Sequence, residues 1–325
     1  MKRRVFLGLG ALVLAARSVA QSGRRPRIGY LLATALLEPP SPERQAFLDG
    51  LRELGYVPGK NVEVIYQSAQ NAVEFVEDLC RDLVAQKVDV IVVSGAIALL
   101  AAKKCTATTP IVFMAVGDPV GIGAVASLSR PEGNITGISF ISSELAGKRV
   151  QLIRELIPAA KRIAVIWDSR NANARAESKA TLAAAAQLGA KAEPYPVASD
   201  AELGAALQRI QPSRPDVLYV TFEGGIVASN RTLIAEFGQR QRLPIVSGWG
   251  FLTEAGALIS YAPSIPPMFR RSASYVDRIL KGAKPSDLPV EQASNVELVI
   301  NMKTAKALGI NIPQSVLVRA DRVIE

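Results

Sequence analysis

The stretch VDVIVVSGAIALLAAKK, residues 88–104, places an apolar run before a Ser-Gly pair and a run rich in Ala and Leu after it. The first run is apolar at consecutive positions, which is typical of a parallel strand buried on both faces. The second run has the composition of a helix. Residues 88–104 therefore predict a strand followed by a helix, the repeating unit of an α/β fold.

Units of the same kind lie on both sides of this stretch. Toward the amino terminus, the apolar run Arg27–Ala33 precedes a helix-like stretch that ends at Gly55, and residues 61–66 precede a second one. Toward the carboxyl terminus, residues 110–116 are apolar, and we expect a short helix around residues 120–128. The rhythm then restarts with five strand-like runs, at residues 161–167, 190–197, 215–222, 244–249 and 257–262. No tight hairpin turn separates the runs, which indicates parallel strands joined by helices.

These units fit either a single barrel of eight βα units or two separate lobes. Beyond Tyr261 the chain continues with a helix-like stretch at 267–281, an extended stretch at 285–290 and a strand-like run at 296–301. A barrel needs no such continuation, whereas a chain that passes back between two lobes uses it to complete both. With 325 residues, 49 % of them hydrophobic, the chain can bury the cores of two α/β lobes.

The first twenty residues are typical of a cleavable export signal. Basic residues at positions 2–4 precede the apolar run Val5–Ala16, and the small residues of Ser18-Val19-Ala20 form an exit site. The apolar run is too short to span a membrane. We therefore expect a signal peptide at residues 1–20, a mature chain beginning near Gln21, and a periplasmic location. Arg3-Arg4-Val5-Phe6-Leu7 also fits the twin-arginine pattern, so the export route stays open.

Charge and cysteine content limit the partners. The formal charge of +9 includes four basic residues of the signal, so the rest of the chain carries +5. Basic residues are spread along the chain and are not gathered with aromatic residues, so we expect no nucleic-acid partner. Cys80 and Cys105 are the only thiols, and either they pair in an oxidising compartment or they remain unpaired small apolar side chains.

Several kinds of catalytic and cofactor chemistry lack their residues. There is no histidine, the commonest general base and zinc ligand, and no Gly-x-Ser-x-Gly motif for serine hydrolysis. Residues 121–126 match a relaxed dinucleotide fingerprint, but they follow the fourth predicted strand and not the first, which favours close glycine packing over cofactor binding. We therefore expect a protein that is not an enzyme and that holds no cofactor and no metal.

In open parallel sheets, ligands bind outside the carboxyl ends of the strands. This rule selects residues from both halves of the chain, namely Thr34, Ser94, Gly95, Ala96, Gly117, Asp118, Asp168, Thr221, Phe222, Glu223 and Trp249. Ser94 and Gly95 offer a hydroxyl and an uncovered amide directly before a helix, which suits a carboxylate, although Ser94 can equally serve as a helix cap. Three of the selected residues can bind a ligand's ammonium group or hydroxyls, or cap the following helix: Asp118, Asp168 and Glu223.

Aromatic residues are few and concentrate near the same strand ends of the second half. Both tryptophans, Trp167 and Trp249, lie at predicted strand ends, and Trp249 lies between two glycines. Near the same side lie Phe140, Phe222, Phe251 and Tyr261. Such aromatic walls suit a planar or apolar ligand. The alternative is that they pack the core at the strand ends.

Five blocks of the sequence together resemble the ABC transporter substrate-binding protein family, which has a type I periplasmic binding fold and includes tryptophan-binding members. The blocks follow one another in the family's order, and the likeness runs over essentially the whole mature chain. The blocks are Gly117–Ser139, Glu144–Pro158, Glu254–Ser264, Arg270–Gln292 and Glu297–Pro313.

The resemblance implies two Rossmann-like lobes with parallel sheets, joined by three crossing hinge segments. We expect one lobe at residues 27–139 and 264–284 and the other at 140–263 and 285–325. The crossings are expected near Ser139-Phe140, Tyr261–Ser264 and Lys284–Gln292.

We therefore expect a monomeric solute-binding component of an ABC uptake system. The inferred site would fit an aromatic or branched amino acid or another small carboxylate. By the resemblance, the partners of the protein would be an ABC permease and its ATPase. Two alternatives stay open, an exported α/β enzyme that uses carboxylates and a sensory receptor on the same fold.

Overall fold

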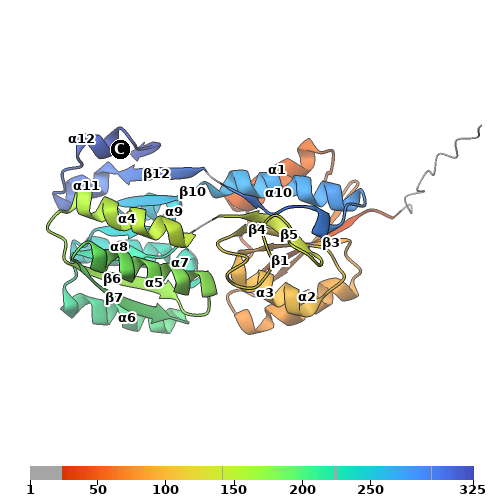
Figure 1. Ribbon diagram of the computed structural model, residues 1–325, viewed down its shortest axis with the longest axis horizontal. Coiled ribbons are helices and arrows are strands. Elements are labelled where there is room, and N and C mark those ends of the chain that lie inside the picture. Colours follow the sequence, from red (N-terminus) through yellow and green to blue (C-terminus); the bar gives the residue numbers. More distant parts are fainter. Residues whose placement is uncertain (1–23, 141, 223–224, 294) are drawn as a thin grey trace, which may run out of the picture.

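The protein has two lobes, each built around one β-sheet with helices on both faces (Figure 1). The computed structural model describes residues 24–140, 142–222, 225–293 and 295–325. The expected signal peptide at residues 1–20 lies outside the described residues. Because the strands form two separate sheets, the repeated βα units build two lobes and not a single barrel.

The first lobe contains a six-stranded sheet in the order β11-β5-β4-β3-β1-β2. All neighbouring strands in it are parallel. The strands are β1 (Arg27–Leu32), β2 (Glu63–Ser68), β3 (Val90–Ser94), β4 (Ile111–Val116), β5 (Ile135–Ser139) and β11 (Glu291–Gln292).

Two layers of helices cover this sheet. On one face lie α1 (Pro42–Glu53) and α10 (Ile265–Leu280), and on the other lie α2 (Val76–Ala85) and α3 (Gly95–Cys105). Short 3-10 turns, η1 (Val73–Phe75) and η2 (Pro285–Asp287), complete the lobe. Residues 90–93 of β3 are fully buried, as their unbroken apolar run predicts.

The second lobe contains a seven-stranded sheet in the order β13-β12-β10-β9-β8-β6-β7. Its pairs are parallel except for β10 and β12, which run antiparallel. The strands are β6 (Arg162–Asp168), β7 (Lys191–Val197), β8 (Val217–Val220), β9 (Ile245–Ser247), β10 (Ile259–Pro263), β12 (Val296–Asn301) and β13 (Arg322–Ile324).

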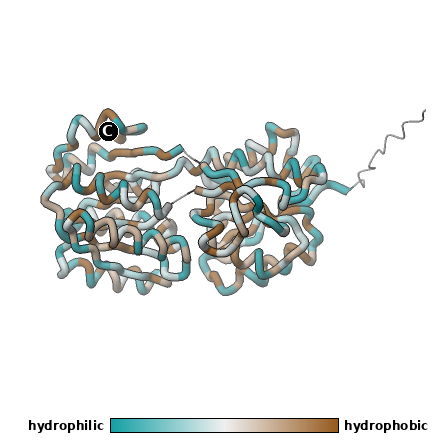
Figure 2. Tube along the Cα trace, viewed as in Figure 1, coloured by the Kyte–Doolittle hydropathy of each residue, from teal (hydrophilic) through white to brown (hydrophobic). Residues whose placement is uncertain are grey.

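Helices again pack on both faces of the second sheet. One face is covered by α4 (Ser142–Leu156), α5 (Ala172–Gln187), α11 (Met302–Leu308) and α12 (Gln314–Leu317). The other is covered by α6 (Asp200–Ser213), α7 (Gly225–Ser229), α8 (Arg231–Gln241) and α9 (Gly250–Ala255). Figure 2 shows polar and apolar residues alternating along the outer helices, as expected for helices with one face on a sheet. Among the described residues, no helix combines the length and apolar character that a membrane span requires.

The chain passes between the lobes three times. The first crossing follows β5 at Phe140, the second lies between β10 and α10 at Ser264, and the third lies between β11 and β12. The crossings touch one another, because the Ser264 amide donates to the Asn295 carbonyl at 3.1 Å and the Ala293 amide donates to the Ser139 carbonyl at 2.8 Å.

The third crossing lies later in the chain than we expected. Residues 285–292, which we assigned to the second lobe, belong to the first, because β11 pairs with β5. Leu288 and Val290 are buried in the first lobe's cores, and the Thr136 hydroxyl donates to the Leu288 carbonyl at 2.7 Å. The burial of these side chains places residues 285–292 in the first lobe. The periodicity of this extended segment did not indicate the lobe to which it belongs.

The short helix expected around residues 120–128 does not form. The segment is a series of turns, in which Oδ1 of Asp118 accepts a hydrogen bond from the Gly121 amide at 2.8 Å. A side chain at Gly121 would collide with Asp118, since a Cβ there would lie 2.0 Å from Oδ2. The glycine therefore permits close packing in a turn, as we expected in preference to cofactor binding.

Candidate functional site

The carboxyl ends of the two sheets face each other at the junction between the lobes. Asn71, which follows β2, donates from Nδ2 to the hydroxyl of Ser229 in α7 at 3.2 Å. Phe140 at the first crossing packs against Phe222, which follows β8. Of the predicted site residues, Phe140 and Phe222 are therefore in contact, and the residues beside them join the two lobes.

Four rings from this junction form a continuous group, the aromatic cluster: Phe140, Phe222, Trp249 and Phe251. Phe140 meets Phe222 edge to face, with ring centres 4.4 Å apart. Phe222 stacks on Trp249 at 4.1 Å with an interplanar angle of 13°, and Trp249 is tilted against Phe251 at 4.7 Å. Phe140 and Phe222 are buried, whereas Trp249 and Phe251 are partly exposed. The cluster thus has a buried half beside the crossing and a partly exposed half toward the second lobe.

Local backbone interactions explain how Trp249 reaches this position. The Ser247 hydroxyl accepts a hydrogen bond from the Trp249 amide at 2.9 Å, and the Gly248 amide donates to the Val220 carbonyl at 3.1 Å. A Cβ at Gly248 would lie 2.6 Å from that of Phe222, so only glycine allows β8 and β9 to bring the two rings together. The indole Nε1 of Trp249 is buried and has no hydrogen-bond partner among the described residues.

Ser94 and Gly95 begin α3 at the carboxyl end of β3. Gly95 has a φ of 79°, a left-handed conformation that side chains other than glycine rarely adopt. Ser94 occupies the N-cap position of α3, but its hydroxyl makes no capping hydrogen bond to the helix. Both residues are partly exposed, and Ala96 beside them is buried.

The three acidic candidates differ in the hydrogen bonds and ion pairs that their carboxylates make within the protein. Oδ1 of Asp118 is engaged by the turn at Gly121. Asp168 is fully buried and paired with Arg170, whose Nε and Nη2 donate to its two carboxylate oxygens at 3.0 and 2.9 Å. Its charge is neutralised within the protein, and its role in binding a ligand stays a prediction. Glu223 lies outside the described residues.

Arg170 is a residue of the junction that we did not predict. From Nη1 it donates to the main-chain oxygen of Asn71 in the other lobe at 3.2 Å. Hydrogen bonds to Asp168 raise the pKa of Arg170, which keeps the guanidinium charged. The sequence signal for this contact is weak, because it is an arginine two residues after a strand-end aspartate.

The four remaining candidates follow strands of the two sheets or lie within one. The Thr34 carbonyl accepts a hydrogen bond from the Ser68 hydroxyl at 2.8 Å, and a Cβ on Gly225 of the other lobe would lie 3.1 Å from the Thr34 methyl. Thr221 is buried and its hydroxyl has no hydrogen-bond partner within the described part of the chain, and Gly117 is also buried. Tyr261 is partly exposed in β10, three residues before the second crossing.

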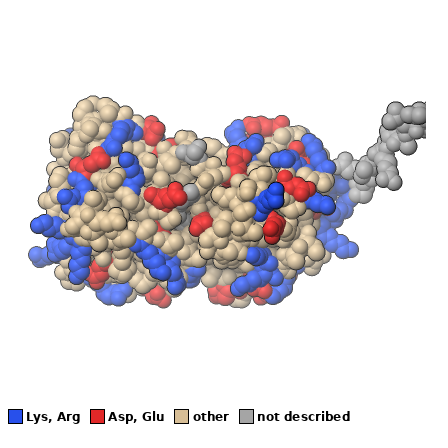
Figure 3. All heavy atoms as spheres, viewed as in Figure 1, with Lys and Arg blue, Asp and Glu red and all other residues tan. Residues whose placement is uncertain are grey.

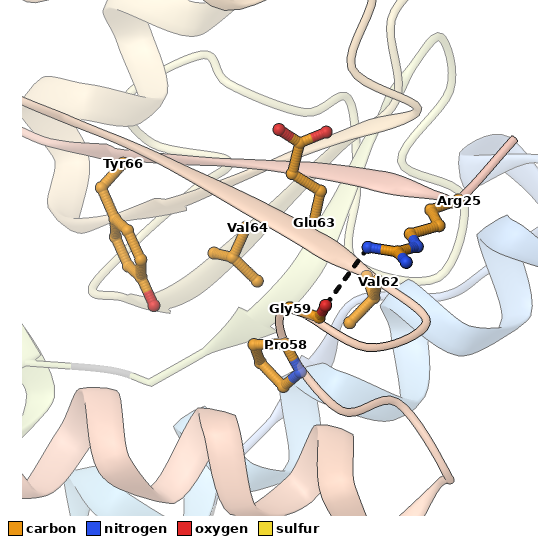
Figure 4. Close-up of a pocket in the computed structure, with 7 residues that line it drawn as sticks. All are labelled: Arg25, Pro58, Gly59, Val62, Glu63, Val64 and Tyr66. Carbon is orange, nitrogen blue, oxygen red and sulfur yellow. Dashed lines mark hydrogen bonds between the residues drawn. The ribbon is translucent and has the colours of Figure 1, made fainter.

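A separate pocket of about 430 Å³ lies at the opposite end of the first sheet (Figure 4). It is lined by Arg25, by the loop around Gly59 and by the first residues of β2, and Nη1 of Arg25 donates to the Gly59 carbonyl at 3.2 Å. Because ligands of parallel sheets bind at the carboxyl ends of strands, this amino-end pocket is not where the fold places its site.

Charged side chains form no single-sign patch on the face shown in Figure 3, where basic and acidic groups alternate over both lobes. Many pair on the surface, for example Arg24 with Asp89 at 2.8 Å. Within the described ranges, no group of three or more metal-binding side chains comes together. Cys80 and Cys105 are free thiols, and burial raises the pKa of Cys80.

Comparison with known proteins agrees with this architecture. The chain is 27 % identical over 278 residues to a tyrosine-binding protein of Clostridioides difficile (strain R20291), an alignment that covers 85 % of this chain and 79 % of the relative.

Solved structures agree over nearly the full length. A conserved domain protein from Vibrio cholerae superposes with a TM-score of 0.86 at 32 % identity, covering 92 % of this chain and all of that one. An ABC domain in complex with L-Trp from Streptococcus pneumonia gives 0.83 at 29 % identity, covering 91 % of this chain and all of that one. The ligand-free, open structure of a substrate binding protein with adhesive properties from Clostridium difficile gives 0.64 at 25 % identity, covering 92 % and 99 %.

A leucine binding protein from Thermotoga maritima, at 18 % identity and a TM-score of 0.55, shares the fold. The family model described as ABC transporter substrate binding protein matches residues 34–324, which include all three crossings and every strand of the two sheets except β1. Since the match extends over almost everything that the structure describes, this chain belongs to the ABC transporter substrate binding protein family.

Proposed function

We propose that this protein binds an amino acid with an aromatic side chain between its two lobes and delivers it to an ABC permease and its ATPase. The observation that carries the proposal is the aromatic cluster, which lies where the lobes meet and leaves Trp249 partly exposed. A relative that binds tyrosine and a similar structure in complex with L-Trp support the same ligand class.

The aromatic cluster would receive the ligand's side chain. Phe222 covers one face of Trp249 and holds the indole in a fixed orientation. A planar ligand ring gains from such a wall, because an aromatic contact is worth about 0.5 to 1.5 kcal/mol beyond the burial of its area. Nε1 of Trp249, which has no hydrogen-bond partner in the part of the chain that the structure describes, adds a donor for a polar group of the ligand.

The first lobe would bind the ligand's main-chain groups. The Ser94 hydroxyl and the first amides of α3 are donors at the positive end of a helix, which favours a carboxylate. The turn engages Oδ1 of Asp118, and the second carboxylate oxygen would accept from an ammonium group. We therefore propose Ser94, Gly95 and Ala96 for the carboxylate and Asp118 for the ammonium.

Binding would be coupled to closure of the lobes. A ligand that touches both lobes only when they are closed shifts the equilibrium by its binding free energy. The contacts between Asn71, Arg170 and Ser229 are those of lobes that have come together. The higher TM-score to the complex with L-Trp than to the ligand-free, open structure is in line with this arrangement.

We further propose that the protein acts as a monomer in the periplasm and by binding, without catalysis. The export signal expected at residues 1–20 and the family membership support this location.

Isothermal titration with the twenty standard amino acids tests the proposal, using protein that has been unfolded and refolded to remove any bound ligand. We expect L-tryptophan, L-tyrosine or L-phenylalanine to bind with micromolar or lower Kd, and glycine and aspartate to show no binding. Mass spectrometry of ligand carried through gentle purification identifies the ligand independently. Preference for a charged or small amino acid, or no binding of any aromatic one, would contradict the proposal.

A further inference from the structure

We infer that Arg149, Glu177 and Tyr219 form a buried positioning unit that holds the aromatic cluster in register with the strand leading to the second crossing. The unit would set ligand affinity without touching the ligand. This inference rests on the proposed function, because it concerns the cluster that we assign to ligand binding.

The unit joins three elements of the second lobe. Arg149 lies on α4, Glu177 on α5 and Tyr219 on β8, and all three are fully buried. Nη1 of Arg149 donates to Oε1 of Glu177 at 2.7 Å and to the Tyr219 hydroxyl at 3.0 Å. The Tyr219 hydroxyl in turn donates to the same Oε1 at 2.8 Å. The three side chains therefore form a closed triangle of hydrogen bonds.

A buried ion pair with a tyrosine contributes little net stability compared with apolar residues in the same place. Removing two charges from water costs several kcal/mol per ion, and apolar replacements of a buried ion pair are often at least as stable. Burial accordingly raises the pKa of Glu177, although the charge of Arg149 opposes this shift. What the group contributes beyond stability is geometry, because each of its bonds requires one arrangement of donor and acceptor.

Both ends of the ion pair hold main-chain atoms at the junction between the lobes. Nε of Arg149 donates to the Tyr261 carbonyl at 2.6 Å, three residues before the chain leaves the lobe at Ser264. Oε2 of Glu177 accepts a hydrogen bond from the Phe222 amide at 2.9 Å. The ion pair thus connects the strand that enters the second crossing to the residue at the centre of the aromatic cluster.

The hydrogen bond from the Phe222 amide to Glu177 links the unit to Trp249. Phe222 lies directly between the ring of Phe140 at 4.4 Å and that of Trp249 at 4.1 Å. A shift of the Phe222 backbone therefore changes both ring contacts at once. Lysine cannot replace Arg149 here, because two separate nitrogens of the guanidinium serve Tyr261 and Glu177 simultaneously.

The test uses Arg149→Lys and Tyr219→Phe in a Trp167→Phe background, so that Trp249 is the only tryptophan. Arg149→Lys keeps the charge but not the two-way contact, and Tyr219→Phe removes only the bridging hydroxyl. Leu203→Ala is the matched control, because it destabilises the buried core of α6 on the other face of the sheet. For each variant we measure the melting temperature, the near-ultraviolet circular dichroism and emission of Trp249 without ligand, and the Kd for L-tyrosine.

We expect Arg149→Lys to change the Trp249 spectra and to weaken L-tyrosine binding at least tenfold, with a smaller change of the same kind for Tyr219→Phe. Leu203→Ala should lower the melting temperature and leave both the spectra and the affinity unchanged. Parent-like spectra and affinity in a folded Arg149→Lys protein would overturn the inference, and should that variant not fold, the same result for Tyr219→Phe would do so. If the parent binds none of L-tyrosine, L-tryptophan and L-phenylalanine, the proposed ligand class fails, while the spectra still decide whether the unit positions the cluster.

Discussion

Arg170 in the second lobe donates a hydrogen bond to the main-chain oxygen of Asn71 in the first lobe, across 3.2 Å. The side chain of the same asparagine donates to the Ser229 hydroxyl at 3.2 Å, so Asn71 is held from two elements of the opposite lobe. Asn71 has a φ of 72°, which asparagine tolerates better than most residues. Asp168 fixes the guanidinium of Arg170 from behind. These four residues form a polar clasp between the lobes that contains none of the aromatic cluster.

We predict that loosening the clasp shifts the lobes toward the open arrangement. Ser229→Ala removes a hydrogen bond worth about 1 kcal/mol, which corresponds to roughly a fivefold change in an equilibrium constant. Arg170→Lys shortens the reach to Asn71 but leaves a charge beside the buried Asp168, so the lobe stays folded. Small-angle X-ray scattering should show a larger radius of gyration, and ligand dissociation should become faster.

Arg175→Ala is the control for the clasp. Arg175 lies on the same stretch of chain but donates within its own lobe, to the Ser169 carbonyl at 3.2 Å. The Arg175→Ala variant should have the same scattering curve and the same ligand dissociation rate as the parent. An unaltered radius of gyration in both Ser229→Ala and Arg170→Lys would remove the clasp from any account of closure.

Gly95→Val should weaken ligand binding at least tenfold, roughly 1.4 kcal/mol. Its φ of 79° is unfavourable for a side chain, and no atom lies within 4 Å of a Cβ placed there, so the cost comes from the backbone turning away from this conformation. That movement displaces the amides proposed for the ligand's carboxylate. Titration calorimetry of the variant with the amino acid that binds the parent measures the effect.

Gly55→Val is matched to that change. Gly55 also has a positive φ, 87°, and open space around a Cβ, but it follows α1 away from the strand ends. Both variants should lose similar stability, and only Gly95→Val should lose affinity. If the two variants bind equally well, Ser94 and Gly95 are not part of the site.

The sequence predicted most of the architecture because buried parallel strands have a strong signature. The unbroken apolar run of β3 left little choice of structure. Residues 285–292 were assigned to the wrong lobe, since an extended segment of two paired residues has no periodicity that reveals its partner. The helix expected at residues 120–128 was wrong because the Asp118 side chain stabilises a turn there.

The sequence indicated which site residues lie at strand ends, but it did not indicate which other side chains contact them. The position of Trp249 after β9 and its flanking glycines indicated the junction, where the indole stacks on Phe222. Nothing local indicated Arg149 or Glu177, because a charged residue on a helix is ordinarily solvent-exposed, and their burial depends on contacts between α4, α5 and β8.

Tyr56 gives a prediction for alkaline pH. Its hydroxyl donates to Oδ1 of Asp277 in α10 at 3.0 Å, and burial, together with this bond, raises its pKa from 10.0 to about 12. A raised pKa in the folded state means that the stabilisation is fully present below the unfolded pKa and is lost as the pH rises toward about 12. The stability gap between the parent and Tyr56→Phe should therefore be constant up to about pH 10 and shrink above it. Urea unfolding of both proteins between pH 8 and pH 11.5 measures this gap, and a gap that widens with pH would contradict the assignment.

Trp249 is the residue on which the proposed ligand class most depends. It is stacked on Phe222 and tilted against Phe251, yet it remains partly exposed and packs against the cores of both lobes. A ring that only filled the core would be buried throughout, and its loss would cost about 3 to 5 kcal/mol of stability.

We therefore predict that Trp249→Ala weakens binding of an aromatic amino acid by the stacking contribution of about 0.5 to 1.5 kcal/mol, roughly twofold to tenfold, plus the burial it supplied. Its loss of stability should stay below the value for a core tryptophan, because part of the ring is already in contact with water. Trp167→Ala is the matched control, since Trp167 is also partly exposed but packs under Arg175, whose guanidinium lies 5.6 Å from its ring centre. Melting temperature and Kd are measured on the same preparation of each protein. A large drop in melting temperature with parent-like affinity would move Trp249 into the core, and the aromatic cluster would then stabilise the junction without selecting the ligand.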